Sequence, residues 1–359
     1  MDPKQLIPYP DTLPAPWGLF NILLVITFFL HLLMANTMLG AGIVLLVKDI
    51  YRRAKDTERD VSREIGDKFP MSIAFTVNLG VAPLLFLQVI YGQFIYVSSV
   101  LMAVYWISIF LLIILAYYFA YIYQFRYERL GMMRILPIGV SVLLLLIVGF
   151  FFTNSALLMI DPKIWPQYFQ NPNGTIIHLA EPSFIPRYLH FVVSSVAVGG
   201  LVLAIFGWFK GRRGEAEGDE LVKNGLLVFG CATMFQFVVG TWYLGTLPNH
   251  ILGKLFFESH IVFPLFLISI VAALASIFFS FSRELWHTVV SCIITIFLMV
   301  LFRYSVRTGY LDSYIASSRP EVDFQFGPFL MFVMALIVGI ITIVYMLKLA
   351  IRAGKERRS

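Results

Sequence analysis

The sequence predicts an all-α membrane protein, a polytopic bundle of about nine transmembrane helices. Hydrophobic residues make up 59% of the 359 residues, charged residues only 13%, and the mean hydropathy is +0.82. Apolar runs of about 18 residues or more recur along the whole chain, and a helix of that length crosses the hydrocarbon core of a bilayer. The net charge of +6 arises from basic residues in the links between runs, so it does not indicate a nucleic-acid partner.

The apolar runs define nine spans in a single transmembrane domain, residues 1–359. In chain order they are residues 17–47, 70–97, 101–125, 132–159, 185–209, 224–248, 259–281, 285–306 and 326–351. The first span follows a polar, proline-rich start, and the second follows a basic link. Pro83 in the second span and Pro264 in the seventh each predict a kink or an irregular turn. The longest links, 48–69, 160–184, 210–223 and 307–325, are too short for an extramembrane domain.

The basic residues predict the orientation of the chain. Most of the 27 Lys and Arg residues fall in links 48–68, 126–134 and 210–223 and in the C-terminal tail, which all lie on one side of the predicted bundle. Because cytoplasmic links carry the excess of Lys and Arg, we expect the N-terminus outside and the C-terminus in the cytoplasm. No cleavable signal peptide is expected, because the start lacks a basic region followed by a short apolar core. The two cysteines, Cys231 and Cys292, both lie in apolar runs, which argues against a disulfide framework.

Three histidines in or beside the spans are candidate ligands of a metal cofactor. His31 lies near the middle of the first span, whereas His190 and His260 enter the fifth and seventh spans from the outer side, at similar shallow depth. Imidazole is costly in hydrocarbon, and two helices can hold a haem through axial histidines. Two other interpretations stay open: the intramembrane histidines can be structural, and His260 can be an ordinary interfacial residue. The small residues after His190, among them Ser195, Gly199 and Gly200, favour either room for a macrocycle or close helix packing.

No Asp or Glu lies in the interior of any predicted span. A proton pump or proton-coupled transporter normally carries an intramembrane carboxylate, so the sequence argues against both classes. Covalent haem c is also excluded, because no C-x-x-C-H motif is present.

Several stretches resemble the haem-bearing large subunit of the cytochrome bd oxidase superfamily. "FFLHLLMANTMLGAGIVLL" resembles its first helix and "FPMSIAFTVNLGVAPLLFLQVIYGQF" its second. "FFFTNSALLMIDP" is similar to the end of its fourth helix, "PRYLHFVVSSVAVGGLVLAIFGWFKGR" to its fifth, and "LLVFGCATMFQFVVGT" to its sixth. The similarity covers residues 20–250 well and the remainder loosely.

This resemblance implies one or two b haems. It implies that His31 binds a high-spin haem and His190 a low-spin haem b near the outer face, with Arg187 as a propionate partner. The methionine that completes the low-spin haem in the family is missing from "FFESHIVFP". By position, His260 is expected to replace that methionine.

The departures from the family argue against oxygen reduction. The third span, "VYWISIFLLIILAYYFAYIY", has no glutamate, the quinol-binding loop is reduced to "GTLPNHILGKLFFES", and Arg307 stands near the place of a haem-ligating glutamate. The sequence therefore predicts a divergent, non-oxidase branch: a redox subunit of an electron-transfer complex in the bacterial inner membrane. It would pass electrons between a quinone pool or other membrane haems and a periplasmic c-type cytochrome, including a multihaem one, beside other membrane subunits.

The aromatic residues of links 160–184 and 307–325 are expected to form the docking surface for that cytochrome. Two alternatives remain open. One is a haem-free, quinone-binding anchor subunit of a membrane redox complex, and the other is a divergent quinol terminal oxidase.

Overall fold

The computed structural model describes residues 3–52, 61–315 and 320–356 and confirms the all-α prediction. Within these residues, nine helices are long and apolar enough to cross a membrane. The spanning helices are α1 (Trp17–Arg52), α3 (Phe69–Leu101), α4 (Ala103–Phe125), α6 (Ile135–Ile160), α7 (Phe184–Arg212), α8 (Gly218–Gly245), α10 (Val262–Phe281), α11 (Leu285–Ile315) and α12 (Phe326–Glu356). The short ones are η1 (Pro3–Leu6), α2 (Val61–Gly66), α5 (Tyr127–Leu130), η2 (Gly131–Arg134), η3 (Pro162–Phe169), α9 (Asn249–Gly253) and η4 (Lys254–Glu258).

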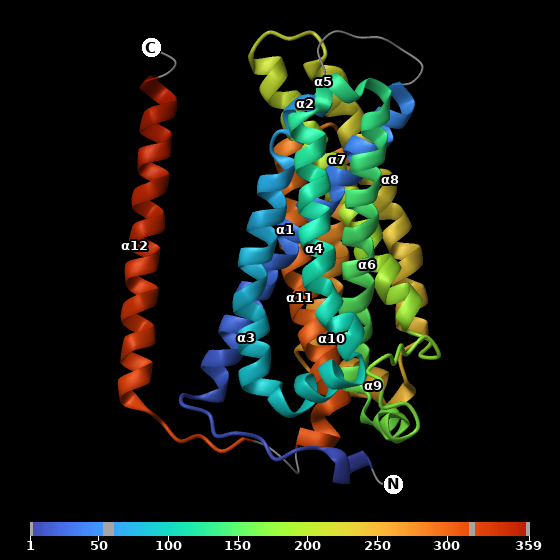
Figure 1. The fold of residues 1–359 in the computed structure, drawn as a ribbon, viewed down its shortest axis with the longest axis vertical. Helices are drawn as coiled ribbons and strands as arrows, with labels where there is room; N and C mark the ends of the chain where they lie inside the picture. The colour runs from blue at the N-terminus through green and yellow to red at the C-terminus, as the bar shows by residue number, and fades with distance from the viewer. Residues whose placement is uncertain (1–2, 53–60, 316–319, 357–359) are drawn as a thin grey trace.

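Successive spanning helices run in opposite directions, so an odd number of them places the two termini at opposite ends of the bundle (Figure 1). We call the end that holds η1, η3 and α9 the N-terminal end, and the end that holds α2 and α5 the C-terminal end. Which end faces the cytoplasm remains a prediction from the basic links. Helix α11 continues to Ile315 rather than stopping at residue 306, so the start of the predicted link 307–325 is helical.

Helix α12 stands apart from the other spanning helices in Figure 1. Its apolar side chains are exposed, for example Ile337 at 51% and Ile341 at 62%. Just before the helix, Leu13 and Val322 form a parallel bridge, in which the Leu13 amide donates to the Glu321 carbonyl at 2.7 Å. A helix that is apolar all round is suited to a lipid environment. The described contact between the α12 segment and the rest of the chain is this main-chain pairing just before the helix.

Helices α1 and α7 cross in direct backbone contact. A Cβ atom built on Gly40 would lie 2.2 Å from the Ser195 carbonyl oxygen, and one on Gly199 would lie 2.6 Å from the Gly40 oxygen. Next to this contact the Asn36 amide donates to Ser194 Oγ at 3.2 Å, and Ser195 Oγ donates to Asn36 Oδ1 at 2.9 Å. The hydrogen-bonded asparagine and the two glycines fix α1 and α7 against each other without intervening side chains.

A neighbouring face of α7, about 100° around the helix, packs on α8 in the same manner. A Cβ on Gly200 would lie 2.6 Å from the Gly225 oxygen, and one on Gly207 would lie 2.8 Å from the Gly218 oxygen. The sequence left two uses open for the small residues after His190, and the structure assigns Ser195, Gly199 and Gly200 to close helix packing. They are in contact with neighbouring helices and provide no room for a macrocycle.

The two prolines inside predicted spans differ in effect. Pro83 lies within α3, and the helical geometry of α3 breaks further on, at Tyr91, where φ is −126° and ψ is 31°. Pro264 lies in the first turn of α10, which begins at Val262, and three residues separate that start from the end of the π-helical η4 at Glu258. A proline is tolerated in a first turn because its missing N–H would have no helical partner there. At this position the irregular-turn alternative is therefore correct.

Two buried charges at the C-terminal end, Asp49 and Lys210, are paired. Asp49 lies in the last turn of α1, which runs beyond the predicted span, and it is buried; its carboxylate accepts from Tyr123 Oη at 2.9 Å and from Arg134 Nε at 3.0 Å. The buried Lys210 ammonium lies 3.2 Å from Glu215 and 3.6 Å from Glu64. Asp49 is thus a buried carboxylate at the margin of a spanning helix, held by fixed donors.

We expect Gly199→Ala to lower the free energy of unfolding by about 1–3 kcal/mol, because the new methyl group would overlap the Gly40 backbone. The matched control is Gly339→Ala in α12, where a Cβ would meet nothing within 4 Å. Thermal unfolding of the detergent-purified variants measures the difference. Equal midpoints for the two variants would show that the α1/α7 contact is looser than described.

Candidate functional site

His31 is held by α3 in one orientation. Its Nδ1 lies 3.0 Å from the Thr76 carbonyl oxygen. A carbonyl oxygen can only accept a hydrogen bond, so Nδ1 carries the proton and Nε2 keeps its lone pair. A Cβ on Gly80, one turn further along α3, would lie 2.9 Å from both Cε1 and Nδ1 of the ring, so a glycine is needed there. The result is an imidazole oriented to donate its Nε2 lone pair, as metal-ligating histidines are.

His190 lies near the start of α7 and faces α8. A Cβ on Gly240 of α8 would lie 3.5 Å from its Cε1, so the ring rests against another glycine. The Gln236 side chain donates to the His190 carbonyl oxygen at 2.8 Å and fixes the backbone. Its Nδ1 is buried, and no hydrogen-bond partner for it is found among the described residues. A buried imidazole nitrogen without a hydrogen-bond partner is unusual because it costs free energy. A role in a functional site explains its presence better than packing does.

The two histidines lie level with each other. The α1/α7 hydrogen bonds join residues whose numbers differ by 158 and 159, and the numbers of His31 and His190 differ by the same 159. Both helices run from the N-terminal end, so equal offsets mean equal height. The sequence predicted His31 deeper than His190, and this is corrected: α1 simply begins further out than α7.

His260 lies elsewhere. It is an exposed residue in the turn before α10. Ser280 of α10 donates to the Leu226 carbonyl of α8 at 2.9 Å, and α8 meets α7 next to that residue, at Gly225 and Gly200. From this shared level His260 is about twenty residues away and His190 about ten, which is roughly 30 Å and 15 Å of helix. The structure therefore places His260 nearer the N-terminal end and does not bring it to His190.

Arg187 belongs to a group of three arginines beside the histidines. Arg187 on α7 lies over the ring of Tyr243 at 5.2 Å, Arg303 on α11 over Phe28 at 4.6 Å, and Arg307 over Tyr91 at 4.7 Å. Arg303 lies within electrostatic range of Arg187, Arg307 and His31. The group therefore links the two histidines through one cationic region on α7 and α11.

The arginines of this group form no ion pair within the described residues, although Asp161 and Glu181 lie within electrostatic range of Tyr310, as Arg187 does. Arg187 Nε and Nη2 and Arg307 Nε are buried and lack hydrogen-bond partners, as does the nearby Tyr310 hydroxyl. No carboxylate in the described ranges forms an ion pair with these arginines. Unpaired buried donors of this kind cost free energy, which an anionic ligand would recover.

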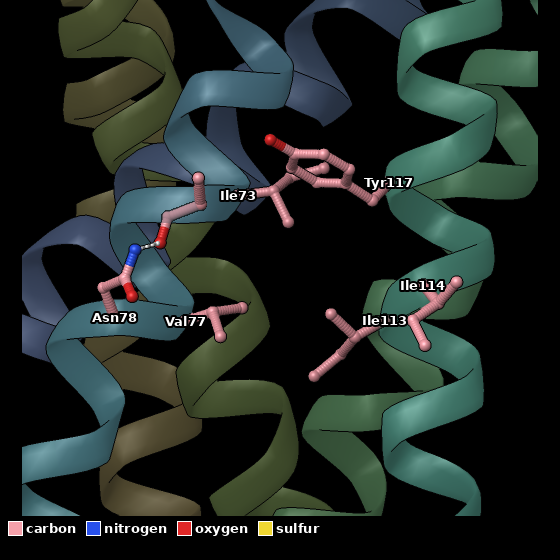
Figure 2. Close-up of a pocket in the computed structure, with 7 residues that line it drawn as sticks. Ile73, Val77, Asn78, Ile113, Ile114 and Tyr117 are labelled. Carbon is pink, nitrogen blue, oxygen red and sulfur yellow. Dashed lines mark hydrogen bonds between the residues drawn. The ribbon is translucent and has the colours of Figure 1, made fainter.

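The donor set is of the kind that a haem requires. His31 offers a free Nε2, His190 offers a half-buried imidazole whose Nδ1 is buried, and the arginines offer donors for carboxylates such as haem propionates. A second axial ligand is not evident for either histidine. By contrast, a groove of about 240 Å³ between α3 and α4, lined by Ile73, Val77, Ile113 and neighbours, is apolar (Figure 2). Its polar side chains are Asn78, whose amide donates to the Ala74 carbonyl at 2.9 Å, and Tyr117, whose hydroxyl lies 3.1 Å from that of Tyr121, and its lining contains no histidine, cysteine, methionine or acidic residue.

Sequence reasoning missed Thr76, Gly80 and Arg303 as parts of this site. The signal for Arg303 was present, because an arginine inside a predicted span is a functional candidate by default. The roles of Thr76 and Gly80 depend on which face of α3 meets α1, and one sequence does not reveal that. Comparison of the chain with known family models and with curated proteins finds no match.

We expect Arg307→Met to stabilise the chain when it is purified from cells that cannot make haem. The change removes a half-buried cation whose Nε is buried without a hydrogen-bond partner and that Arg303 repels, and should raise the free energy of unfolding by about 1–3 kcal/mol. Thermal unfolding in detergent is the measurement. The control is Arg212→Met, which removes an exposed arginine that lies over Trp208 at the C-terminal end. A lower midpoint for Arg307→Met would mean that the guanidinium is already neutralised.

Proposed function

We propose that the chain is a membrane haem b subunit that carries electrons and does not itself reduce oxygen. In this proposal it passes electrons between a quinone pool or other membrane haems and a c-type cytochrome outside the bacterial inner membrane. The fold supports the coarser part of this statement, a multi-pass helical membrane protein. The finer part of the proposal is argued from the histidines and arginines in the half of the bundle nearer its N-terminal end.

One observation carries the proposal: two imidazoles lie level on parallel helices, next to three arginines that form no ion pair within the described residues. Each imidazole faces a glycine of a neighbouring helix, Gly80 for His31 and Gly240 for His190. Purely structural histidines would be expected to satisfy both ring nitrogens, whereas Nδ1 of His190 is buried without a partner. A bound haem would explain both groups of residues. The histidines would ligate its iron, and the arginines would pair with its propionates.

A bound haem b supplies a one-electron iron couple. The residues of the chain bind and tune it. The Thr76 carbonyl fixes the His31 tautomer and makes Nε2 the ligand atom. Arg187 is proposed as a propionate donor beside His190, and Arg303 and Arg307 extend the same role toward His31. The positive charge of these arginines favours the reduced, less positive iron and so raises its potential.

The proposed partner surface lies at the N-terminal end. Only part of the predicted aromatic dock is available there: Trp165 is buried and donates to the Leu158 carbonyl, whereas Phe169 is 65% exposed and Phe324 is 49% exposed. Phe257 and Ile261, next to His260, add exposed apolar surface at 85% and 76%. This surface fits a partner better than water, although aromatic residues also occupy the headgroup level of bilayers.

The His190→Ala variant should lose one low-spin b-type signal in the reduced-minus-oxidised spectrum, because the axial imidazole is gone. The control is His287→Ala, an exposed histidine at the C-terminal end that should leave the spectrum unchanged. A wild-type protein without a Soret band would favour the haem-free anchor instead. An unchanged spectrum in His190→Ala would refute the ligand assignment. Because the structure does not bring His260 to His190, His260→Ala in the same assay should leave the low-spin signal in place.

Gly80→Ala should alter the spectrum or the midpoint potential of the haem at His31 without removing that haem. The added methyl group would lie 2.9 Å from Cε1 and Nδ1 and must turn the ring away from the Thr76 carbonyl. Gly245→Ala, where a Cβ would meet nothing within 4 Å, is the control. Redox titration of both variants makes the comparison, and identical potentials would count against His31 as a ligand.

A further inference from the structure

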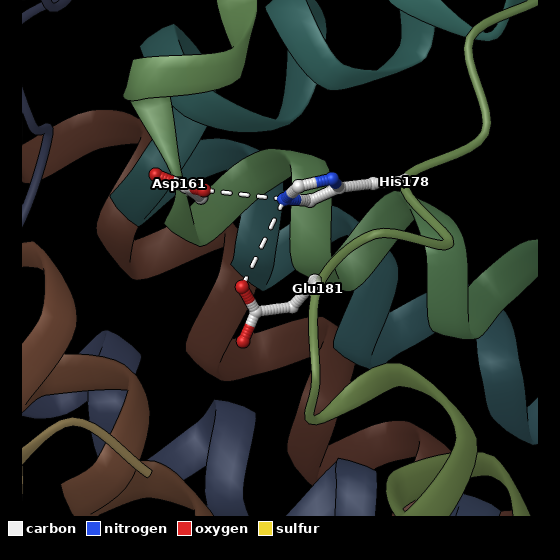
Figure 3. A group of neighbouring side chains, drawn as sticks. All are labelled: Asp161, His178 and Glu181. Atoms are coloured by element: carbon white, nitrogen blue, oxygen red, sulfur yellow. Dashed lines mark hydrogen bonds and ion pairs between the residues drawn. The ribbon is translucent and has the colours of Figure 1, made fainter. Parts of the chain in front are cut away.

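We propose that Asp161, His178 and Glu181 form a binding site for one divalent transition-metal ion, with Zn²⁺ as the best match. The site lies at the N-terminal end, where α6 ends and the segment leading to α7 passes over it (Figure 3). It is separate from His31 and His190, and its evidence does not depend on the haem proposal.

The three side chains already converge on one point. His178 Nε2 lies 3.2 Å from Asp161 Oδ2 and 3.9 Å from Glu181 Oε2, and the three ligand atoms all lie within 4.8 Å of one another. Figure 3 shows both carboxylates directed at the same ring nitrogen. Zn²⁺ holds N and O ligands at about 2.0–2.2 Å, which places tetrahedral neighbours roughly 3.4 Å apart. Shifts of an ångström or less would bring these atoms to coordination distance.

The second oxygen of each carboxylate is already engaged. Asp161 Oδ1 accepts from the Lys163 amide at 3.3 Å, and Glu181 Oε1 accepts from Ser183 Oγ at 3.0 Å. The remaining oxygen of each is therefore the one that faces His178. Carboxylates that ligate a metal are commonly oriented in this way, by a hydrogen bond to their other oxygen.

His178 is fixed by the buried end of α6. Its amide donates to Asn154 Oδ1 at 2.8 Å, and the Asn154 amide group donates to the Ile176 carbonyl at 3.0 Å. The His178 side chain is only 8% exposed, and its other nitrogen, Nδ1, is buried without a hydrogen-bond partner in the described ranges. The imidazole thus has one direction open to it, toward the two carboxylates.

The charge of the group favours a dication. Two carboxylates and a neutral imidazole carry a charge of −2 within a few ångströms, which a divalent ion neutralises. One nitrogen and two carboxylate oxygens suit Zn²⁺ or Mn²⁺ better than Mg²⁺ or Ca²⁺, which prefer oxygen ligands alone. Three protein ligands leave a fourth position for water. The competing arrangement is a protonated His178 that forms ion pairs with both acids and binds no metal.

A metal at this point would tie the end of α6 to the segment that starts α7. Asp161 directly follows Ile160, the last residue of α6, and Glu181 stands three residues before α7 begins at Phe184. It would order the longest link of the N-terminal end, the same link that carries the exposed Phe169.

The test uses the full chain, purified in detergent with a tag that contains no histidine and stripped with EDTA. Zn²⁺ is titrated by calorimetry, and bound zinc is counted by mass spectrometry after desalting. We expect one Zn²⁺ per chain in the wild type, and at least tenfold weaker binding in His178→Ala and in the isosteric Asp161→Asn. The matched control is His287→Ala, because His287 also lies 3.3 Å from a carboxylate, Glu284, but on an exposed surface.

The outcomes separate the two arrangements. A wild type that binds no zinc, or variants that bind it as tightly as the wild type, would overturn the proposal. Loss of zinc in His287→Ala would do the same, because it would move the ion to the other end of the bundle. If His178→Ala unfolds, Glu181→Gln decides: Zn²⁺ should raise the thermal midpoint of the wild type and of His287→Ala, but not that of Glu181→Gln.

Discussion

The contact of Gly40 with Gly199 sets the positions on which the rest of the site depends. Within a membrane, helices associate through close packing and interhelical hydrogen bonds, since lipid is as apolar as their side chains. Here two glycines bring the backbones together, and Asn36 fixes the register through Ser194 and Ser195. Because α7 uses Gly200 and Gly207 in the same way against α8, one helix determines the placement of both neighbours. The heights of His31 and His190 follow from this register.

Charge is distributed unequally along the bundle. At the C-terminal end, Asp49 is matched by Arg134, and Lys210 by three nearby glutamates. Toward the N-terminal end, three arginines meet aromatic rings and one another instead of carboxylates. A folded chain tolerates such an excess only where something offsets it, because unpaired buried charge is strongly destabilising. The unpaired donors of these arginines, in contrast to the Lys254–Asp312 ion pair at the same end, support the proposed anionic ligand.

Much of the fold could be predicted from the sequence, because each run of apolar residues is about as long as a helix that crosses the bilayer. The candidate histidines could also be predicted, since a polar group in such a run is conspicuous. The neighbours of those histidines could not. Thr76 and Gly80 look like ordinary helix residues until α3 is placed against α1, and the equal height of His31 and His190 depends on a crossing point rather than on distance from the helix ends. For the same reason Asp161, His178 and Glu181, separated along the chain, show no motif before the link folds.

The spacing between each histidine and its crossing glycine has an angular consequence. His31 precedes Gly40, and His190 precedes Gly199, by the same nine residues. At 3.6 residues per turn, nine residues are about two and a half turns, so each imidazole projects roughly 180° away from the seam between α1 and α7. The ring contacts agree, because His31 meets α3 and His190 meets α8. The two imidazoles therefore point away from each other and cannot grip one iron between them. Any metal bound to one is a separate centre from any bound to the other, with the helix pair as the wall that an electron must cross.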